Sequence, residues 1–397
     1  MQYSRLVHLW KGIKVLDKLK FLNLSHSQKL VSCPDFTGVP NLEKLILEDC
    51  SSIIEIHPSV GFLKNLVLLN LKNCRNLKSL PNSIQLDNLE TLILSGCLKL
   101  GNFPEVMGAM NCLSEVYLEA TAVKELPSSI ERLTGLRLMN LGFCRNLTNL
   151  PKTIGRLKSV RIHILSGCSK LEKLPEELGH IEILEELYCN DTSIQSPPSS
   201  ITLLKNLKTL SFHGCKGMVS QSWSSLFFAW LRPRKNTEPT SLMFSSFSGL
   251  FSLRKLDLSY CCMLDEGIPS DLGCLSSLVE LNLSGNNFVD ISQASLKMLP
   301  QLRILELVGC ERLERLPELP TAIEEVFADN CASLMNDMGI LTDYKMLQRI
   351  SFTNCVGLLQ NQQTHDMATS LWLHLFKKCI VKSGHFSIYL PGEQVPE

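Results

Sequence analysis

The chain has 397 residues, and its 39 lysine and arginine residues balance 39 aspartate and glutamate residues, so its formal net charge is zero. This balance excludes a surface of one sign, and we therefore expect no nucleic-acid partner. The longest apolar runs, residues 226–231 and 371–376, fall well short of the ~20 residues that a membrane-spanning helix needs, so we expect no membrane span. The first twenty residues have neither a sustained apolar core nor a small-residue cleavage site, and we expect no secretory signal.

A leucine frame, L-x-x-L-x-L-x-x-C/N-x-x-L, recurs along the chain, mostly every 23 or 24 residues. This period and pattern are the signature of leucine-rich repeats. The in-register copies begin at Leu19, Leu42, Leu66, Leu89, Leu113, Leu136, Val160, Leu184, Leu207, Leu253, Leu278, Leu302 and Ile323.

One copy, "LVLLNLKNCRNLKSLPNSI", predicts the structure of the unit. Leu69 and Leu71 alternate with Asn70 and Lys72, which is typical of a short strand with one buried face. Leucine-proline pairs follow in several copies, and proline disfavours helix at the residue before it, so the return leg should be extended or a short 3-10 turn. These pairs are Leu80–Pro81, Leu126–Pro127, Leu150–Pro151, Leu174–Pro175 and Leu316–Pro317.

A single copy cannot bury its own leucines, so the copies must stack. We predict an α/β leucine-rich-repeat solenoid, a curved horseshoe with a parallel sheet on its concave side and short 3-10 or extended segments on its convex side. About 13 repeats should occupy residues 1–334.

Three segments depart from the frame. Residues 216–247 are predicted to be an insertion or an eroded repeat, and their aromatic residues either pack on the solenoid or form an exposed patch. Their basic stretch 232–236 is expected to be a solvated loop. Residues 335–383 should form a C-terminal cap and a linker helix. Residues 384–397 alternate like a strand that has no visible partner, which predicts the incomplete start of another domain.

Ten of the sixteen cysteines occupy the same repeat position, the slot after the strand. A small buried side chain there is expected to donate to backbone carbonyls of the turn, so we interpret these thiols as structural. Side chains in register keep their Cβ atoms about one strand spacing, ~4.8 Å, apart, too far for a disulfide, which favours a reducing cytosol or nucleus. The ladder comprises Cys50, Cys74, Cys97, Cys144, Cys168, Cys215, Cys261, Cys310, Cys331 and, in a last copy, Cys355.

Catalytic, cofactor and metal sites have little support in the sequence. The chain contains no C-x-x-C pair, no clustered histidines and no G-x-x-x-x-G-K-S/T loop, so we expect no structural zinc and no nucleotide bound in that manner. The one close nucleophile and base are Cys215 and His213, which should face opposite sides of the strand exit. We therefore predict a protein without enzymatic activity and without a cofactor.

Function should lie on the outward positions of the concave sheet. Tyrosine and arginine are enriched at the residues that dominate protein interfaces, so their recurrence at these positions predicts a protein-binding surface, although each of them singly is also an ordinary exposed residue. The predicted contact residues are Tyr117, Arg137, Phe143, Arg161, Tyr188, His213, Arg254 and Tyr260.

The cysteine-slotted frame with leucine-proline return legs, as in "CRNLKSLPNSI", resembles the leucine-rich-repeat region of plant intracellular immune receptors of the TIR-type nucleotide-binding class. "IPSDLGCLSSLVELNLSGNNF" and "LPELPTAIEEVFADNCASL" carry the same resemblance, and the tail "FSIYLPGEQVPE" looks like the start of the jelly-roll domain that follows the repeats in that class.

This resemblance implies two partners: a pathogen effector or a guarded host protein, and the nucleotide-binding module of the same receptor, which the repeats hold inactive. The chain has no TIR domain and no P-loop, so the resemblance assigns it neither catalysis nor nucleotide exchange. The alternative is a secreted or cell-surface receptor ectodomain that binds a peptide or protein ligand. That alternative rests on four N-x-S/T sequons, at Asn23, Asn146, Asn190 and Asn282.

Overall fold

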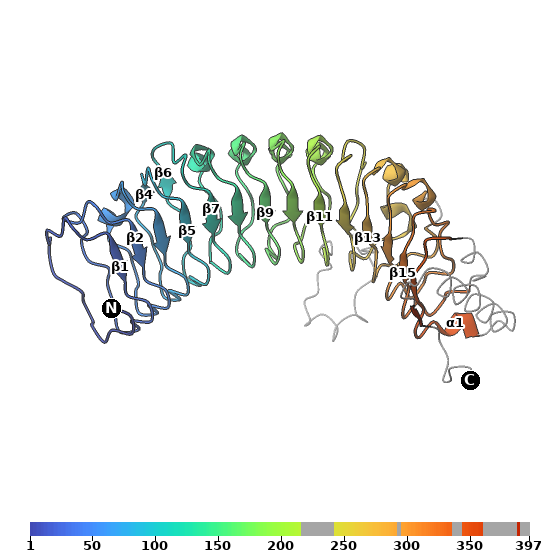
Figure 1. Ribbon diagram of the computed structural model, residues 1–397, viewed down its shortest axis with the longest axis horizontal. Helices are drawn as coiled ribbons and strands as arrows, with labels where there is room; N and C mark the ends of the chain where they lie inside the picture. Colours follow the sequence, from blue (N-terminus) through green and yellow to red (C-terminus); the bar gives the residue numbers. More distant parts are fainter. Residues whose placement is uncertain (216–241, 292–294, 336–343, 360–386, 390–397) are drawn as a thin grey trace, which may run out of the picture. The chain divides into compact units, whose positions relative to one another are not determined.

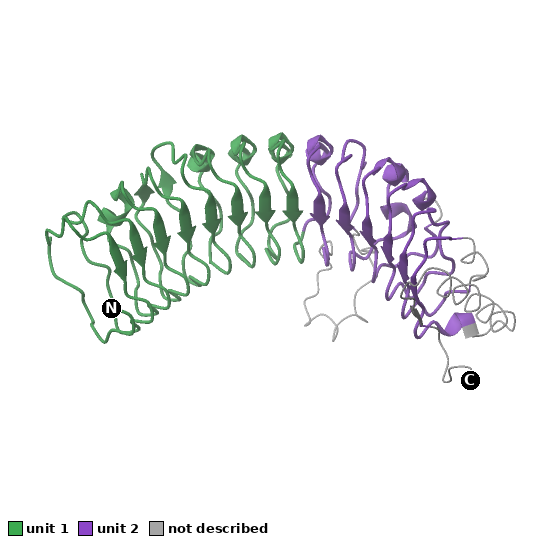
Figure 2. Ribbon diagram, viewed as in Figure 1, with its two compact units in different colours: residues 1–193 green, residues 194–397 purple. Residues whose placement is uncertain are grey.

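The computed structural model describes residues 1–215, 242–291, 295–335, 344–359 and 387–389. The chain forms two compact units, Met1–Ser193 and Ile194–Glu397, coloured separately in Figure 2. The leucine frame runs through both units and did not predict this division. Most of the predicted insertion and of the predicted cap and linker lies outside the described residues.

Unit 1 is a stack of parallel strands that pair in chain order, each with its neighbour along the sequence (Figure 1). Each strand has three residues, and its middle residue is buried while the flanking residues face outward, because side chains alternate across a strand. The strands are β1 (Phe21–Asn23), β2 (Lys44–Ile46), β3 (Leu68–Asn70), β5 (Thr91–Ile93), β7 (Glu115–Tyr117), β8 (Leu138–Asn140), β9 (Ile162–Ile164) and β10 (Glu186–Tyr188).

The return legs of unit 1 are short 3-10 helices or extended segments, which confirms the prediction from proline. Three of the 3-10 helices start directly after a proline of a leucine-proline pair, and that proline keeps an extended backbone. Pro81 is followed by an extended segment that pairs with the next return leg. These elements are η1 (Pro58–Phe62), η2 (Ser128–Arg132), η3 (Lys152–Arg156), η4 (Glu176–His180), β4 (Ser83–Ile84) and β6 (Glu105–Val106).

Unit 2 repeats the same plan. Its strands are parallel and in register: β11 (Thr209–Ser211), β12 (Lys255–Asp257), β13 (Glu280–Asn282), β14 (Ile304–Glu306), β15 (Glu325–Phe327), β16 (Arg349–Ser351) and β17 (Ser387–Tyr389). The described helices are η5 (Ser199–Leu203), η7 (Asp265–Gly267), η8 (Ser270–Cys274), η10 (Leu296–Met298) and the single turn α1 (Val356–Leu359). Both units are leucine-rich-repeat solenoids, as the frame predicts.

The structure shifts two predicted boundaries in unit 2. β11 pairs directly with β12, and Leu242, Phe244 and Phe247 are buried, so residues 242–247 belong to a return leg rather than to the inserted segment. The repeats also continue past residue 334, because β16 pairs with β15 and Cys355 is buried in the slot. β17 in turn pairs with β16, so the last predicted strand does have a partner.

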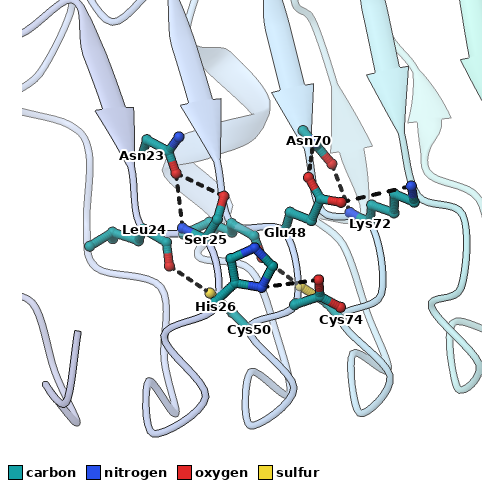
Figure 3. A network of polar contacts seen from close by, with 11 residues as sticks. Asn23, Leu24, Ser25, His26, Glu48, Cys50, Asn70, Lys72 and Cys74 are labelled. Atoms are coloured by element: carbon teal, nitrogen blue, oxygen red, sulfur yellow. Dashed lines mark hydrogen bonds and ion pairs between the residues drawn. The ribbon is translucent and has the colours of Figure 1, made fainter. Parts of the chain in front are cut away.

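The slot after each strand joins consecutive repeats. The Sγ of Cys50 lies 3.2 Å from the carbonyl oxygen of Leu24 in the preceding repeat, and that of Cys74 lies 3.1 Å from Leu47 O (Figure 3). The same thiol-to-carbonyl contact, at 2.9 to 3.4 Å, is made by Cys97, Cys144, Cys168, Cys261, Cys310, Cys331 and Cys355. All ten slot cysteines are buried. The slot thiol therefore gives a second partner to a carbonyl that already accepts a backbone amide of its own turn, as Leu47 O accepts from Cys50 N at 3.2 Å.

Burial also suppresses the chemistry of these thiols, because a thiolate is poorly solvated inside the stack. Burial raises the pKa of Cys50 to about 11 and that of Cys97 to about 12. It raises the pKa of Cys74 and Cys261 further still. Since the thiolate is the reactive form, these four cysteines are poor nucleophiles.

Thiol labelling tests this ladder. In the native protein we expect Cys112 and Cys274, the exposed cysteines of the described residues, to react first with a thiol reagent. The slot cysteines should react only on unfolding, because they are buried and protonated. Mass spectrometry of timed samples distinguishes the two classes. Titration of all sixteen thiols after denaturation without reductant would establish that none is in a disulfide. Labelling of Cys74 as fast as Cys112 in the folded protein would contradict the ladder.

One core position breaks the leucine frame. His163, the middle residue of β9, is fully buried, and its register neighbours are Met139 and Leu187. Neither ring nitrogen has a hydrogen-bond partner. Burial lowers the pKa of His163 from 6.5 to about 4, because the imidazolium ion loses its water there. An unpaired buried polar group costs about 1–3 kcal/mol of folding free energy, so this histidine destabilises unit 1.

Replacing His163 by leucine restores the frame, and we expect the free energy of unfolding at neutral pH to rise by about 1–3 kcal/mol. The folded state keeps His163 neutral between pH 6.5 and about 4, whereas the unfolded state takes up a proton there, so wild-type stability should fall as the pH falls through this window. His163→Leu should remove up to ~1.4 kcal/mol per pH unit of that slope. Denaturant unfolding at several pH values measures both effects. Met139→Leu is the control, and an unchanged slope in His163→Leu would disprove the assignment.

Candidate protein-binding surface

Five of the predicted contact residues lie in unit 1, on four adjacent strands or directly beside them. Tyr117 ends β7 and Tyr188 ends β10, and both are half-buried on the outward side of the sheet. We call the outward residues of these four strands the β7–β10 face. It consists of Glu115, Tyr117, Leu138, Asn140, Ile162, Ile164, Glu186 and Tyr188.

Strand register orders this face into two rows. One row reads Tyr117, Asn140, Ile164 and Tyr188, and the other reads Glu115, Leu138, Ile162 and Glu186. Each row therefore has matching residues at its two ends. The apolar side chains between them are held in place because the middle residue of every strand is anchored in the core.

A hydrogen bond ties the two rows together at each end. The hydroxyl of Tyr117 donates to Glu115 Oε2 at 3.2 Å, and that of Tyr188 donates to Glu186 Oε2 at 2.9 Å. Partial burial and the nearby Glu115 carboxylate raise the pKa of Tyr117, so its hydroxyl stays protonated as a donor. Each tyrosine thus fixes the orientation of a carboxylate two residues before it.

The predicted arginines lie where the chain enters β8 and β9. Arg137 and Arg161 are exposed, and Arg161 forms an ion pair with Glu185. Arg137 has no ion-pair partner among the residues that the structure describes. An exposed ion pair contributes little to stability, so these side chains remain available to a partner.

Phe143 and Tyr260 lie outside the strands, in the turn that follows them. Both have a left-handed backbone, with φ of 56° and 58°, and each covers a glycine of the next repeat. A Cβ on Gly167 would lie 2.5 Å from the Phe143 ring, and one on Gly285 would lie 2.3 Å from the Tyr260 ring. Both rings are also about half exposed, so they combine a packing role with an accessible edge.

Unit 2 carries the other three predicted residues. The His213 Nδ1 lies 2.7 Å from Ser259 Oγ. The His213 and Tyr260 rings pack edge to face, with their centroids 5.4 Å apart. Arg254 is exposed before β12. His213, Arg254 and Tyr260 therefore form a second, separate set of candidate contacts.

The geometry gives no support to the Cys215 and His213 pairing. Cys215 is fully buried, while His213 is half-exposed and directs its Nδ1 to Ser259. In the part of the chain that the structure describes, no group of three or more histidine, cysteine, aspartate or glutamate side chains is placed to hold a metal ion. None of the described helices is long and apolar enough to cross a bilayer.

The asparagines at the ends of several strands have a structural role at the strand exit. The Oδ1 of Asn70 accepts from Lys72 N at 2.9 Å, and that of Asn140 accepts from Gly142 N at 2.8 Å. Asn23 makes the same contact with Ser25 (Figure 3). The asparagine side chain thus closes the turn at the strand exit. In the sequence, the pattern that indicates this role is an asparagine at the end of a strand with serine, lysine or glycine two residues later.

Two known protein families match the chain, in three segments. Residues 85–175 match the family described as "Disease resistance protein RPS4B-like, leucine-rich repeats", and residues 252–275 and 277–299 match Leucine Rich Repeat. Among solved structures, a leucine-rich-repeat protein of Leptospira interrogans superposes with a TM-score of 0.55 at 19% identity, covering 94% of this chain and 96% of that one. These findings define a leucine-rich-repeat protein.

Full-length relatives narrow the assignment. The chain is 38% identical over 354 residues to TMV resistance protein N of Nicotiana glutinosa, covering 88% of this chain and 29% of the relative. It is 36% identical over 367 residues to Disease resistance-like protein DSC1 of Arabidopsis thaliana, covering 91% and 28%. The chain therefore belongs to the leucine-rich-repeat regions of plant disease resistance proteins of the TIR-type nucleotide-binding class, and it spans less than a third of these relatives.

The alternative of a secreted ectodomain is not favoured by these relatives. The structure adds a local reason, because two of the sequon asparagines are engaged at strand exits. Asn23 accepts hydrogen bonds from Ser25, and Asn282 both accepts from Ser284 N and donates to Glu306. A glycan is attached to the side-chain nitrogen, so on Asn282 it would crowd the hydrogen bond that this nitrogen donates to Glu306.

Proposed function

We propose that this chain is the recognition module of a plant immune receptor, and that it binds a pathogen effector or a guarded host protein through the outward side of its strands. The observation that carries this proposal is the β7–β10 face. There, half-exposed tyrosine and apolar side chains, with arginines beside them, stand on strands whose other side is fully buried. Such a rigid aromatic surface is suited to protein recognition.

A second part of the proposal rests on the resemblance alone. The repeats also hold the nucleotide-binding module of the same receptor inactive until a partner binds. The thiols of nine slot cysteines contact backbone carbonyls and form no disulfide, which supports a reducing compartment, the cytosol or the nucleus, as the place where this happens. Neither role requires the chain to catalyse a reaction, so we propose a non-catalytic module.

The test is binding to the pathogen protein that activates the corresponding receptor. Replacing Tyr117 and Tyr188 together by alanine should weaken binding by at least about 30-fold, because even one aromatic anchor at an interface centre contributes about 2 kcal/mol or more. Phe62→Ala is the matched control, since Phe62 is 53% exposed on a return leg and not on the sheet. Unchanged affinity in a folded Tyr117→Ala, Tyr188→Ala double variant would overturn this surface.

A further inference from the structure

The β7–β10 face carries more information than a general contact surface, because its charges are placed at fixed positions. Glu115 and Glu186 stand at the two ends of one row, and Leu138 and Ile162 lie between them. All four are half-exposed. The row therefore presents acid, apolar, apolar and acid in a line that runs across the strands.

Within the described part of the chain, neither carboxylate has a basic partner. No ion pair joins Glu115 or Glu186 to a lysine, arginine or histidine among the described residues, whereas the neighbouring Glu185 is paired with Arg161. Each carboxylate accepts one tyrosine hydroxyl through Oε2, which holds the group in place. A carboxylate that is fixed but not neutralised is ready to pair with a basic group from another molecule.

The spacing of the two carboxylates matches the spacing of side chains in an extended peptide. β7 and β10 are three strand intervals apart, which at ~4.8 Å each is about 14 Å. In an extended peptide, residues i and i+4 lie on the same side and about 13 Å apart, with residue i+2 halfway between them. Basic residues at i and i+4 would therefore meet Glu115 and Glu186 while residue i+2 lies over Leu138 and Ile162.

The middle of the row rejects a third basic residue. Arg137 directly precedes Leu138 and has no ion-pair partner among the residues that the structure describes, and a cation over Leu138 would be repelled by it. An apolar residue there gains contact with Leu138 and Ile162 and avoids that repulsion. The surface thus favours the order basic, apolar, basic over a uniformly basic segment.

Resting on the function proposed above, we propose that the β7–β10 face binds an extended segment of a partner protein in which two basic residues, four positions apart, flank an apolar residue. The partner lies across the strands, its basic groups pair with Glu115 and Glu186, and its apolar side chain covers Leu138 and Ile162. Tyr117 and Tyr188 form the adjoining wall of the site.

A labelled peptide containing Arg-Thr-Leu-Thr-Arg is the probe, because threonine favours the extended backbone. Fluorescence anisotropy at low ionic strength measures its binding to the whole chain, since salt screens exposed charge pairs. Glu115→Gln and Glu186→Gln should each weaken binding by about fivefold. Glu172→Gln, an exposed acid outside the β7–β10 face, removes the same charge and should leave binding unchanged.

Two further peptides test the order of the residues. Moving the second arginine to position i+3 places it on the opposite side of an extended chain, so binding should fall to background. Replacing the central leucine by arginine should also weaken binding, although it adds charge. Equal binding of all three peptides, or an equal effect of Glu172→Gln and Glu115→Gln, would overturn the proposal and leave general charge attraction.

The experiment separates this proposal from the function on which it rests. If the tyrosine double variant no longer binds the effector, while Glu115→Gln and Glu186→Gln leave peptide binding unchanged, the chain is a recognition module but its partner does not have the proposed pattern of basic and apolar residues. If the peptide behaves as expected while the tyrosine double variant keeps its effector, the face binds basic segments and the effector binds elsewhere.

Discussion

The structure depends on one contact that recurs in nearly every repeat, the bond from the slot side chain to a carbonyl of the preceding repeat. A strand of three residues makes few ladder bonds, and the slot side chain adds one more bond between consecutive repeats. A thiol donates weakly, yet it fills the slot without strain, as in Cys74 and Leu47. Asn286 shows the stronger version, donating to Leu258 O and Leu283 O and accepting from two backbone amides of the preceding repeat.

Because of this contact, the buried side of each strand determines the packing of the repeats, and the outward side determines the surface. The buried side and the slot fix the spacing between repeats, and substitutions there disturb the stack. Apolar outward residues such as Ile162 and Ile164 have no part in that spacing, so a change there alters the surface at little cost in stability. Recognition on this scaffold is therefore a property of rows of residues from several repeats, and a row is continuous in space but not in sequence.

Much of the fold could be predicted from the sequence, because leucine and proline act within one repeat. Leu69 and Leu71 define a strand by their spacing, and Pro127 defines the start of a 3-10 helix. What could not be predicted depends on residues 23 or 24 positions away. Phe143 was expected on the sheet, but it lies in the turn because Gly167 of the next repeat leaves room for its ring. The sequence did not reveal that His163 has no hydrogen-bond partner, because this depends on the residues that pack around it in the neighbouring repeats.

The candidate site was predicted in part for the same reason. Tyrosine and arginine could be recognised singly, and Tyr117 and Tyr188 do lie on one face. Their pairing with Glu115 and Glu186 required the register of four strands, which sets which residues share a row. Register also places two glutamates that are distant in the sequence three strand intervals apart, and this separation favours a partner of matching spacing, which composition cannot specify. In a repeat protein, the specificity of the surface therefore follows from the same regular spacing that the buried slot maintains.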